Sequence, residues 1–297
     1  MPIWIPVTFA AAFAQNLRSL LQKKLRSELS VWGATSARFL YAAPLAALVA
    51  AVLWGTSDAD LSAPGASFAA LAMTGGIAQI IATGCMIHLF SYRNFAVGTA
   101  FTKTEVLQTA LFGLVLLGEG VSLPALLAII GGLAGILLIS LPVEAGRSRF
   151  ALDGRVIYGI LSGGLFGLSA VCFRGASLSL GDGPAFLRAS LTLAAVLGFQ
   201  ALLIGVWLKL REAGELSRVW RAWRVGGLVG IAGLVASLGW FTAMTLENAA
   251  HVRAVGQVEI VFTILTSWFV FKEKINAREL AGLAVLTASI VALVVMA

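Results

Sequence analysis

The sequence predicts an all-α membrane protein in which ten transmembrane helices form two inverted repeats of five helices each. Three observations predict this fold class: a composition too apolar for a soluble domain, ten apolar segments of membrane-spanning length, and equivalent residues that recur 154 positions apart. Residues 1–142 are expected to form the first repeat and residues 143–297 the second, inverted one.

The composition is that of a polytopic membrane protein. Hydrophobic residues make up 59% of the 297 residues and charged residues only 12%, whereas soluble domains average about 45–50% and about 25%. A soluble protein of this size could not cover such a core with so few charges. The net charge of +7 does not indicate nucleic-acid binding, because the basic residues concentrate in the connections between apolar segments.

Apolar windows of about 19 residues indicate ten membrane spans. Their connections are short and polar or charged, and none is long enough to hold a soluble domain. The first span lacks a basic leader and a cleavage signal, so we expect it to be retained rather than removed as a signal peptide. The expected spans are Ile3–Leu21, Val31–Trp54, Ser67–Phe90, Phe95–Leu117, Ser122–Leu141, Val156–Phe173, Pro184–Leu208, Val225–Leu246, Ala249–Phe271 and Ala277–Ala297.

Basic residues are unevenly distributed over the connections, and this predicts the orientation of the chain. Of the 21 lysines and arginines, 15 follow odd-numbered spans, five lie inside spans, and only Arg174 lies on the opposite side. Short cytoplasmic loops carry an excess of Lys and Arg. We therefore expect a multi-pass protein of the cell (inner) membrane with both termini on the non-cytoplasmic side.

Glu105 and Glu259 are the strongest functional candidates. Each carboxylate lies near the middle of an apolar span, and the shift of 154 residues superposes Glu259 on Glu105 and Glu273 on Glu119. A charge at the bilayer centre costs at least about 2.5–3.5 kcal/mol, so its default interpretation is functional. Inverted repeats with a binding site near the midplane are typical of secondary transporters. The pattern therefore predicts a transport pathway that works by alternating access.

Further polar side chains inside the spans extend the candidate substrate-binding set. Arg38 and Arg188 occupy equivalent spans, so each repeat supplies one arginine and one glutamate, which can pair within or between repeats. One interpretation is a set of static salt bridges. The other is a midplane cavity in which arginine holds a carboxylate, glutamate holds an ammonium group, and a glutamate is a candidate carrier of a coupling proton. The remaining candidates are Arg18, Lys103, Arg253, Gln79 and Trp240, of which Trp240 fits an aromatic packed between helices better than a cavity-lining residue.

Small residues recur every four positions on several spans, for example at Gly163 and Gly167 on the sixth and at Gly131 and Gly135 on the fifth. Small residues at this spacing let helices approach closely. Packing within the chain is the preferred interpretation, and a homodimer face on the fifth span is the alternative.

The chain carries no sequence pattern of an enzyme or a cofactor site. His88 and His251 form no H-E-x-x-H motif, and no Walker loop, G-x-S-x-G or dinucleotide fingerprint occurs. Cys85 and Cys172 lack the spacing of metal ligands. We therefore expect no enzyme activity, no metal and no cofactor. The alternative to a transporter is a non-transporting membrane protein, either a lipid-processing enzyme or a scaffold, whose internal charges are structural salt bridges.

Both repeats end in a pattern that resembles the EamA branch of the drug/metabolite transporter superfamily. The first has Leu117-Gly118-Glu119-Gly120, then a proline and the glycine-rich stretch Ile130–Gly135; the second has Phe271–Ile275 followed by Leu280–Leu283. The resemblance covers essentially the whole chain. It implies a ten-helix transporter for a small molecule in a lipid bilayer, often an amino-acid or amine exporter, with an aromatic amino-acid exporter as the nearest analogue.

The chain departs from that branch in two respects. Its members usually have both termini in the cytoplasm, the reverse of the orientation that the charge bias predicts. Familiar exporters of the branch also tend to have apolar or aromatic cavities, whereas this chain places several charges inside its spans. The charges favour export of a small polar or amphoteric metabolite, such as an amino acid, over a hydrophobic compound.

Overall fold

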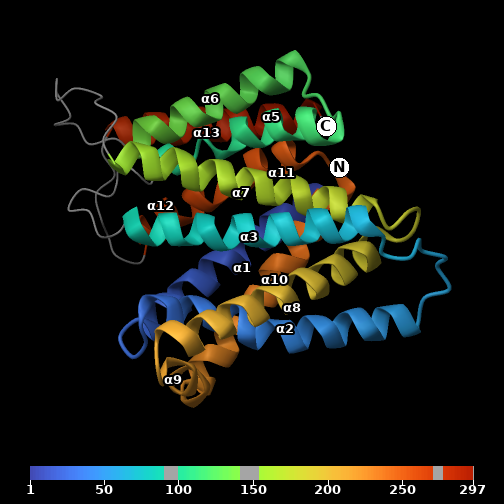
Figure 1. The fold of residues 1–297 in the computed structure, drawn as a ribbon. Helices are drawn as coiled ribbons and strands as arrows, with labels where there is room; N and C mark the ends of the chain where they lie inside the picture. The colour runs from blue at the N-terminus through green and yellow to red at the C-terminus, as the bar shows by residue number, and fades with distance from the viewer. Residues whose placement is uncertain (90–99, 141–153, 270–276, 297) are drawn as a thin grey trace. The chain divides into compact units, whose positions relative to one another are not determined.

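The computed structural model of the chain is built from helices (Figure 1). It describes residues 1–89, 100–140, 154–269 and 277–296. Within these ranges the structure contains helices and short connections but no strand, which confirms the expected all-α class. Glu273 and the motif Phe271–Ile275 lie outside the described ranges.

Eight helical segments in the described ranges are long and apolar enough to cross a membrane. Each of them overlaps one of the ten expected spans. The other two expected spans are helical as well, the first as α1 (Trp4–Leu25) and the ninth as α11 (Ala249–Gly256) followed by α12 (Val258–Phe269). The count of ten spans stays a prediction. The eight segments are Val31–Gly55, Ala66–Met86, Ala100–Leu117, Leu123–Ser140, Val156–Leu178, Ala185–Arg211, Trp223–Leu246 and Ala277–Met296.

The chain divides into two compact units, and each unit combines segments from both halves of the sequence. Unit 1 consists of Met1–Ile5, Ala78–Val171 and Asn248–Ala297, and unit 2 of Pro6–Ile77 and Cys172–Glu247. Three of the four boundaries between the units fall within helices: α1, α3 (Ala66–Leu89) and α7 (Gly154–Leu178). The fourth falls between Glu247 and Asn248, just before α11.

In unit 1, α6 (Leu123–Ser140) packs along α13 (Ala277–Met296), as Figure 1 shows, and α5 (Glu105–Leu117) packs on α11. Two glycines allow α6 and α13 to pack closely. A Cβ atom on Gly135 would lie 2.7 Å from the carbonyl oxygen of Gly282, and one on Gly282 would lie 2.6 Å from that of Gly135. Small residues allow this approach in a membrane. Gly135 therefore serves packing within the chain, as the preferred interpretation held.

In unit 2, α2 (Val31–Gly55) packs on both α8 (Ala185–Arg211) and α10 (Trp223–Leu246). Helices α2 and α8 are antiparallel. The hydroxyl of Ser30, before α2, donates to Glu212, after α8, whereas the Ser62 N–H, beyond the other end of α2, donates to the carbonyl of Leu180, before α8.

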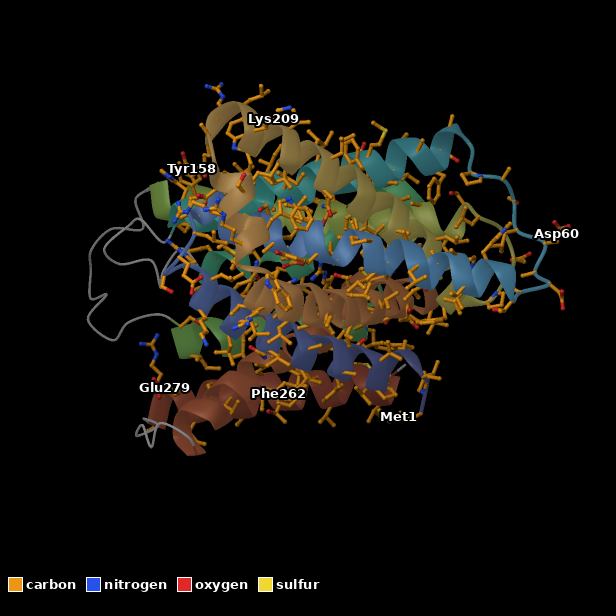
Figure 2. The ribbon with its side chains drawn as sticks, turned by 90° about the horizontal axis from the view of Figure 1, so that it is seen from below. Met1, Asp60, Tyr158, Lys209, Phe262 and Glu279 are labelled. Atoms are coloured by element: carbon orange, nitrogen blue, oxygen red, sulfur yellow. The ribbon has the colours of Figure 1, made fainter. Side chains whose placement is uncertain are left out.

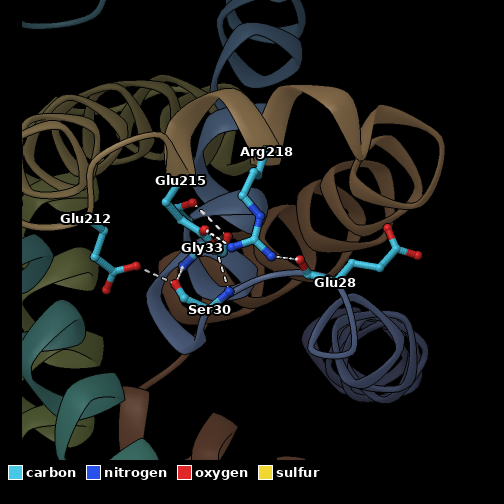
Figure 3. Close-up of polar contacts among 7 residues, drawn as sticks. Glu28, Ser30, Gly33, Glu212, Glu215 and Arg218 are labelled. Atoms are coloured by element: carbon cyan, nitrogen blue, oxygen red, sulfur yellow. Dashed lines mark hydrogen bonds and ion pairs between the residues drawn. The ribbon is translucent and has the colours of Figure 1, made fainter.

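A polar network ties the start of α2 to the short helix α9 (Glu215–Arg221), as Figure 3 shows. Glu215 is only 3% exposed, and its carboxylate accepts hydrogen bonds from the Ser30 N–H at 2.5 Å and from the Arg218 guanidinium at 2.7 Å. The Ser30 hydroxyl donates to Glu212 at 2.5 Å. The network fixes the connection between α8 and α10 to the connection between α1 and α2.

The two ends of unit 2 differ in charge. Lys209 and Arg211 lie where α8 ends, beside the network that contains Arg218. Asp60 lies in the connection after α2 (Figure 2), and Asp182 lies just before α8, at the opposite end of this antiparallel pair. The basic connections that the sequence assigned to one side of the membrane thus lie at one end of this unit.

Candidate functional site

The two spans that carry the candidate glutamates are broken in the structure. The sequence predicted spans over Phe95–Leu117 and Ala249–Phe271, and their described parts are helical, with one interruption in each. A turn at residues 103–104 precedes α5, and another turn, at Gln257, separates α11 from α12.

Both breaks have the same local geometry. The Lys103 N–H donates to the carbonyl of Ala100 at 3.1 Å, and the Gln257 N–H donates to that of Ala254, also at 3.1 Å. Each bond spans three residues, as in a 3₁₀ turn, instead of the four of an α-helix. Because 154 residues separate the two donors and likewise the two acceptors, the break belongs to the repeat.

Each break places a candidate glutamate in the first turn of a helix. Glu105 is the first residue of α5, and Glu259 is the second residue of α12. The N-terminus of a helix has unpaired N–H groups and a partial positive charge, so a carboxylate is stabilised there. This gives a physical reason why two apolar spans tolerate carboxylates near their centres.

Both glutamates form ion pairs with a cation from the other repeat. The Nζ atom of Lys103 lies 2.5 Å from Oε1 of Glu259, and the Nε atom of Arg253 lies 3.1 Å from Oε1 of Glu105. All four residues belong to unit 1. The shift of 154 residues superposes Gln257, a neutral residue, on Lys103. The glutamates are therefore repeat-equivalent, but their cationic partners are not.

The two ion pairs differ in exposure. The side chains of Lys103 and Glu259 are 24% and 22% exposed, and those of Arg253 and Glu105 are 14% and 13% exposed. The Lys103–Glu259 pair is thus the more accessible to a ligand. The Arg253–Glu105 pair is closer to a buried ion pair, for which the loss of one partner is strongly destabilising.

Helix α7 packs against the break before α5. A Cβ atom on Gly163 would lie 2.6 Å from the carbonyl oxygen of Thr102, and one on Gly167 would lie 2.7 Å from the hydroxyl oxygen of Thr109. The packing interpretation of these glycines is confirmed. Their close contact with α5 supports the segment in which the helix is interrupted.

The other charged candidates, Arg18, Arg38 and Arg188, lie in unit 2. The neutral candidate Gln79 is a half-buried residue of α3 in unit 1. Arg188 donates from Nη1 to the carbonyl of Gly181 at 2.7 Å, and the guanidinium carbon of Arg38 lies 4.7 Å from the ring centroid of Phe39. The expected pairing of these arginines with the two glutamates stays a prediction, because the glutamates belong to unit 1.

Trp240 and Arg18 contact neighbouring helices of unit 2. The indole N–H of Trp240, which is buried in α10, donates to Oε1 of Gln15 in α1 at 3.0 Å. The side chain of Arg18 lies against Gly233 of α10, where a Cβ atom would be 3.4 Å from its Cδ atom. These contacts favour the interpretation of Trp240 as a residue packed between helices.

A small cavity lies beside Lys103 in unit 1; its volume of about 10 Å³ gives room for about one water molecule. Side chains of α6, α11 and α13 and of the segment around the α5 break line it. Its polar lining residues are Lys103, Gln257 and Ser289. The other lining residues are small or aliphatic: Val106, Ala128, Ile129, Gly132, Leu133, Ile136, Ala254, Leu286, Ile290 and Leu293.

The four residues of the two ion pairs allow recognition of a ligand by ion pairing. Arginine and lysine bind carboxylates, and a carboxylate binds an ammonium group. Across the part of the chain that the structure describes, no group of three or more His, Cys, Asp and Glu side chains is placed to hold a metal ion.

Comparisons with known proteins identify the family. A crystal structure described only as that of a protein has 16% sequence identity and a TM-score of 0.71 over 98% of this chain and 99% of that one, which shows a shared fold. No curated protein matches the chain. The sequence model of the EamA-like transporter family matches residues 2–141 and again residues 155–295. This is a family of transporters, not of enzymes. The chain therefore belongs to the EamA-like transporter family and is a membrane transporter of the drug/metabolite superfamily.

Proposed function

We propose that the chain is a secondary transporter that exports a small polar or amphoteric metabolite, an amino acid or a related compound, across the cytoplasmic membrane by alternating access. The observation that carries the proposal is the pair of crossed ion pairs, Lys103–Glu259 and Arg253–Glu105, at two equivalent helix breaks. Charged groups inside a membrane mark substrate and ion pathways. An amphoteric substrate brings one charge of each sign, so it can replace both partners of an ion pair and leave no charge unpaired.

The helix breaks supply a means of movement for this mechanism. A 3₁₀ segment inside a helix often marks a hinge. Broken helices whose N-termini face the substrate, in inverted repeats that open to opposite sides in turn, are the general design of such transporters. We assign residues 1–142 and 143–297 to the two inverted repeats, and the turns at residues 103–104 and at Gln257 to their hinges.

Two further features of the proposal follow from charge. Glu259 is the proposed carrier of a coupling proton, because it is the more exposed glutamate and its protonation would weaken its attraction to Lys103. The Lys and Arg bias supports an orientation in the inner membrane with both termini on the non-cytoplasmic side. A reporter that is active only in the periplasm should then be active when it is fused to the C-terminus. Activity of a cytoplasmic reporter at the same position would show the opposite orientation.

Counterflow uptake in proteoliposomes tests the transport proposal. The wild type is compared with Glu105→Gln and Glu259→Gln, using labelled amino acids and organic anions. Asp60→Asn is the matched control, because it removes a carboxylate from an exposed connection (Figure 2). We expect uptake of an amphoteric compound by the wild type and the control, and a loss of at least about tenfold in both glutamate variants, equivalent to about 1.4 kcal/mol.

Each variant must be monodisperse before its uptake is interpreted. Counterflow at the wild-type level in both glutamate variants would show that the two ion pairs are not part of the transport site. A well-folded wild type that takes up no compound of the panel would refute transport of a polar or amphoteric metabolite.

A further inference from the structure

We infer that the connection between α8 and α10 binds the phosphate headgroup of an anionic phospholipid. The residues of this site belong to unit 2, and the residues of the proposed transport site belong to unit 1, so the two proposals share no side chain. The bound lipid holds α9 at the membrane surface, where the polar network already fixes α9 to the start of α2.

The segment formed by residues 207–224 carries an unbalanced positive charge. It contains five basic residues and only two acidic ones, Glu212 and Glu215. Both carboxylates accept hydrogen bonds from Ser30, and Glu215 also pairs with Arg218 (Figure 3). The other four basic side chains are exposed and form no ion pair among the described residues: Lys209, Arg211, Arg221 and Arg224. They are available to an anion from outside the chain.

Helix α9 turns its charged side away from the protein. Val219 is 0% exposed and belongs to a buried apolar cluster with Val229 of α10. Arg221 lies two residues further on, about 200° around the helix, and is exposed. Trp220 between them is 51% exposed. A buried apolar face combined with exposed cationic and aromatic residues is typical of a helix that lies at a membrane surface.

Two arginines at the ends of the segment lie over exposed tryptophan rings. The guanidinium carbon of Arg211 is 5.5 Å from the ring centroid of Trp207, and that of Arg224 is 5.7 Å from the ring centroid of Trp223. Tryptophan settles at the level of the lipid headgroups. An arginine over a ring still has N–H groups at its edge, which bind phosphate in a bidentate manner. The segment therefore presents phosphate donors at the depth where lipids present phosphate.

The apolar surface next to these cations fits a phospholipid better than a free anion. Leu203, Val206 and Leu210 of α8 are 40%, 49% and 76% exposed. Their spacings of three and four residues place them on one face of the helix. This face ends beside Lys209 and Arg211. A phospholipid can use both parts, since its headgroup binds the cations and its acyl chains pack on the apolar face, whereas inorganic phosphate gains only the first contact.

Thermal unfolding of the whole purified chain in an uncharged detergent tests the inference. Phosphatidylglycerol, which is anionic, and phosphatidylcholine, which has no net charge, are added at equal mole fractions. A ligand that binds only the folded state raises the unfolding temperature. We expect phosphatidylglycerol to raise it, and phosphatidylcholine or an equal concentration of inorganic phosphate to leave it unchanged.

Two double variants remove different halves of the site: Arg221→Gln with Arg224→Gln, and Lys209→Gln with Arg211→Gln. All four side chains are exposed, so we expect both variants to fold. Each should bind phosphatidylglycerol about 30-fold more weakly than the wild type, equivalent to about 2 kcal/mol for two basic residues near an anionic surface. The matched control, Arg26→Gln with Arg278→Gln, also removes two positive charges but leaves the segment intact, so it should keep the wild-type affinity.

Three results would overturn the inference. Equal stabilisation by phosphatidylcholine would show that the anionic headgroup is not recognised. Equal stabilisation by inorganic phosphate would show a site for a free anion. Wild-type affinity in both double variants, or an equal loss in the control, would show that the segment is not the place of binding. None of these measurements involves transport, so the proposed function is tested separately.

Discussion

Replacing Gly135 by alanine should push α6 and α13 apart. A Cβ atom at this position would lie 2.7 Å from the carbonyl oxygen of Gly282 and 2.8 Å from the backbone nitrogen of Leu286, whereas ordinary contacts begin at 3.4 Å. Both obstacles are backbone atoms, which cannot rotate away. The two helices must therefore separate locally by about 0.7 Å, the difference between 3.4 and 2.7 Å.

The expected loss in the free energy of unfolding follows from this displacement. Overpacking typically costs about 1–3 kcal/mol, and a gap of about 0.5–1 Å forfeits a quarter to a half of each dispersion contact. Alanine also stabilises a helix by about 1 kcal/mol relative to glycine. Gly132→Ala, three residues earlier in α6, gains the same propensity without a clash. Gly135→Ala should therefore be less stable than Gly132→Ala by about 1–3 kcal/mol.

Equilibrium unfolding from mild detergent by added SDS, followed by far-UV circular dichroism, measures this difference. Gly282→Ala should behave like Gly135→Ala, because its Cβ atom would lie 2.6 Å from the carbonyl oxygen of Gly135. Equal stability of Gly135→Ala and Gly132→Ala, within about 0.5 kcal/mol, would refute the close contact between α6 and α13, since a clash of this kind costs more.

Two further stability predictions use the same unfolding assay. Glu215→Ala should lower the free energy of unfolding by about 1–3 kcal/mol, because it leaves the Ser30 N–H without its acceptor. Unchanged stability would contradict this role of the network. Glu105→Gln and Arg253→Met should each lower the free energy of unfolding by about 3–5 kcal/mol. The double variant should lower it by less than the sum of the two single effects, because the residues are paired. Strict additivity would contradict that ion pair.

The helices could be predicted from the sequence because apolar length is a local property. The expected span Ser122–Leu141 agrees with α6 (Leu123–Ser140), and Ala277–Ala297 agrees with α13 (Ala277–Met296). The interruption at residues 103–104 could not be predicted in this way. A window of about 19 residues averages over a two-residue turn, and no proline lies in that turn to indicate it.

The candidate site could be predicted only in part. Glu105 and Glu259 are recognisable because they are isolated carboxylates at equivalent positions, and Lys103 and Arg253 belong to the same candidate set. Their crossed pairing depends on how α5 packs on α11, which the spacing of residues within one span does not determine. The contact between Ser30 and the network around α9 likewise joins segments about 185 residues apart.

The central claim is that the Lys103–Glu259 pair binds substrate and is more than a structural salt bridge. Exchanging its charges, with Lys103→Glu and Glu259→Lys in one protein, tests this most directly, because the ion pair is retained while its polarity is reversed. An amphoteric substrate would then have to bind with its ammonium and carboxylate groups exchanged, which moves the rest of the molecule from its place in the wild type.

The measurement is counterflow, in proteoliposomes, of the amphoteric compound that the wild type transports. The exchanged variant is compared with the wild type and with each single variant. We expect the exchanged variant to fold better than either single variant but to lose this counterflow. Counterflow at the wild-type level in the exchanged variant would show that the pair only holds the helices together.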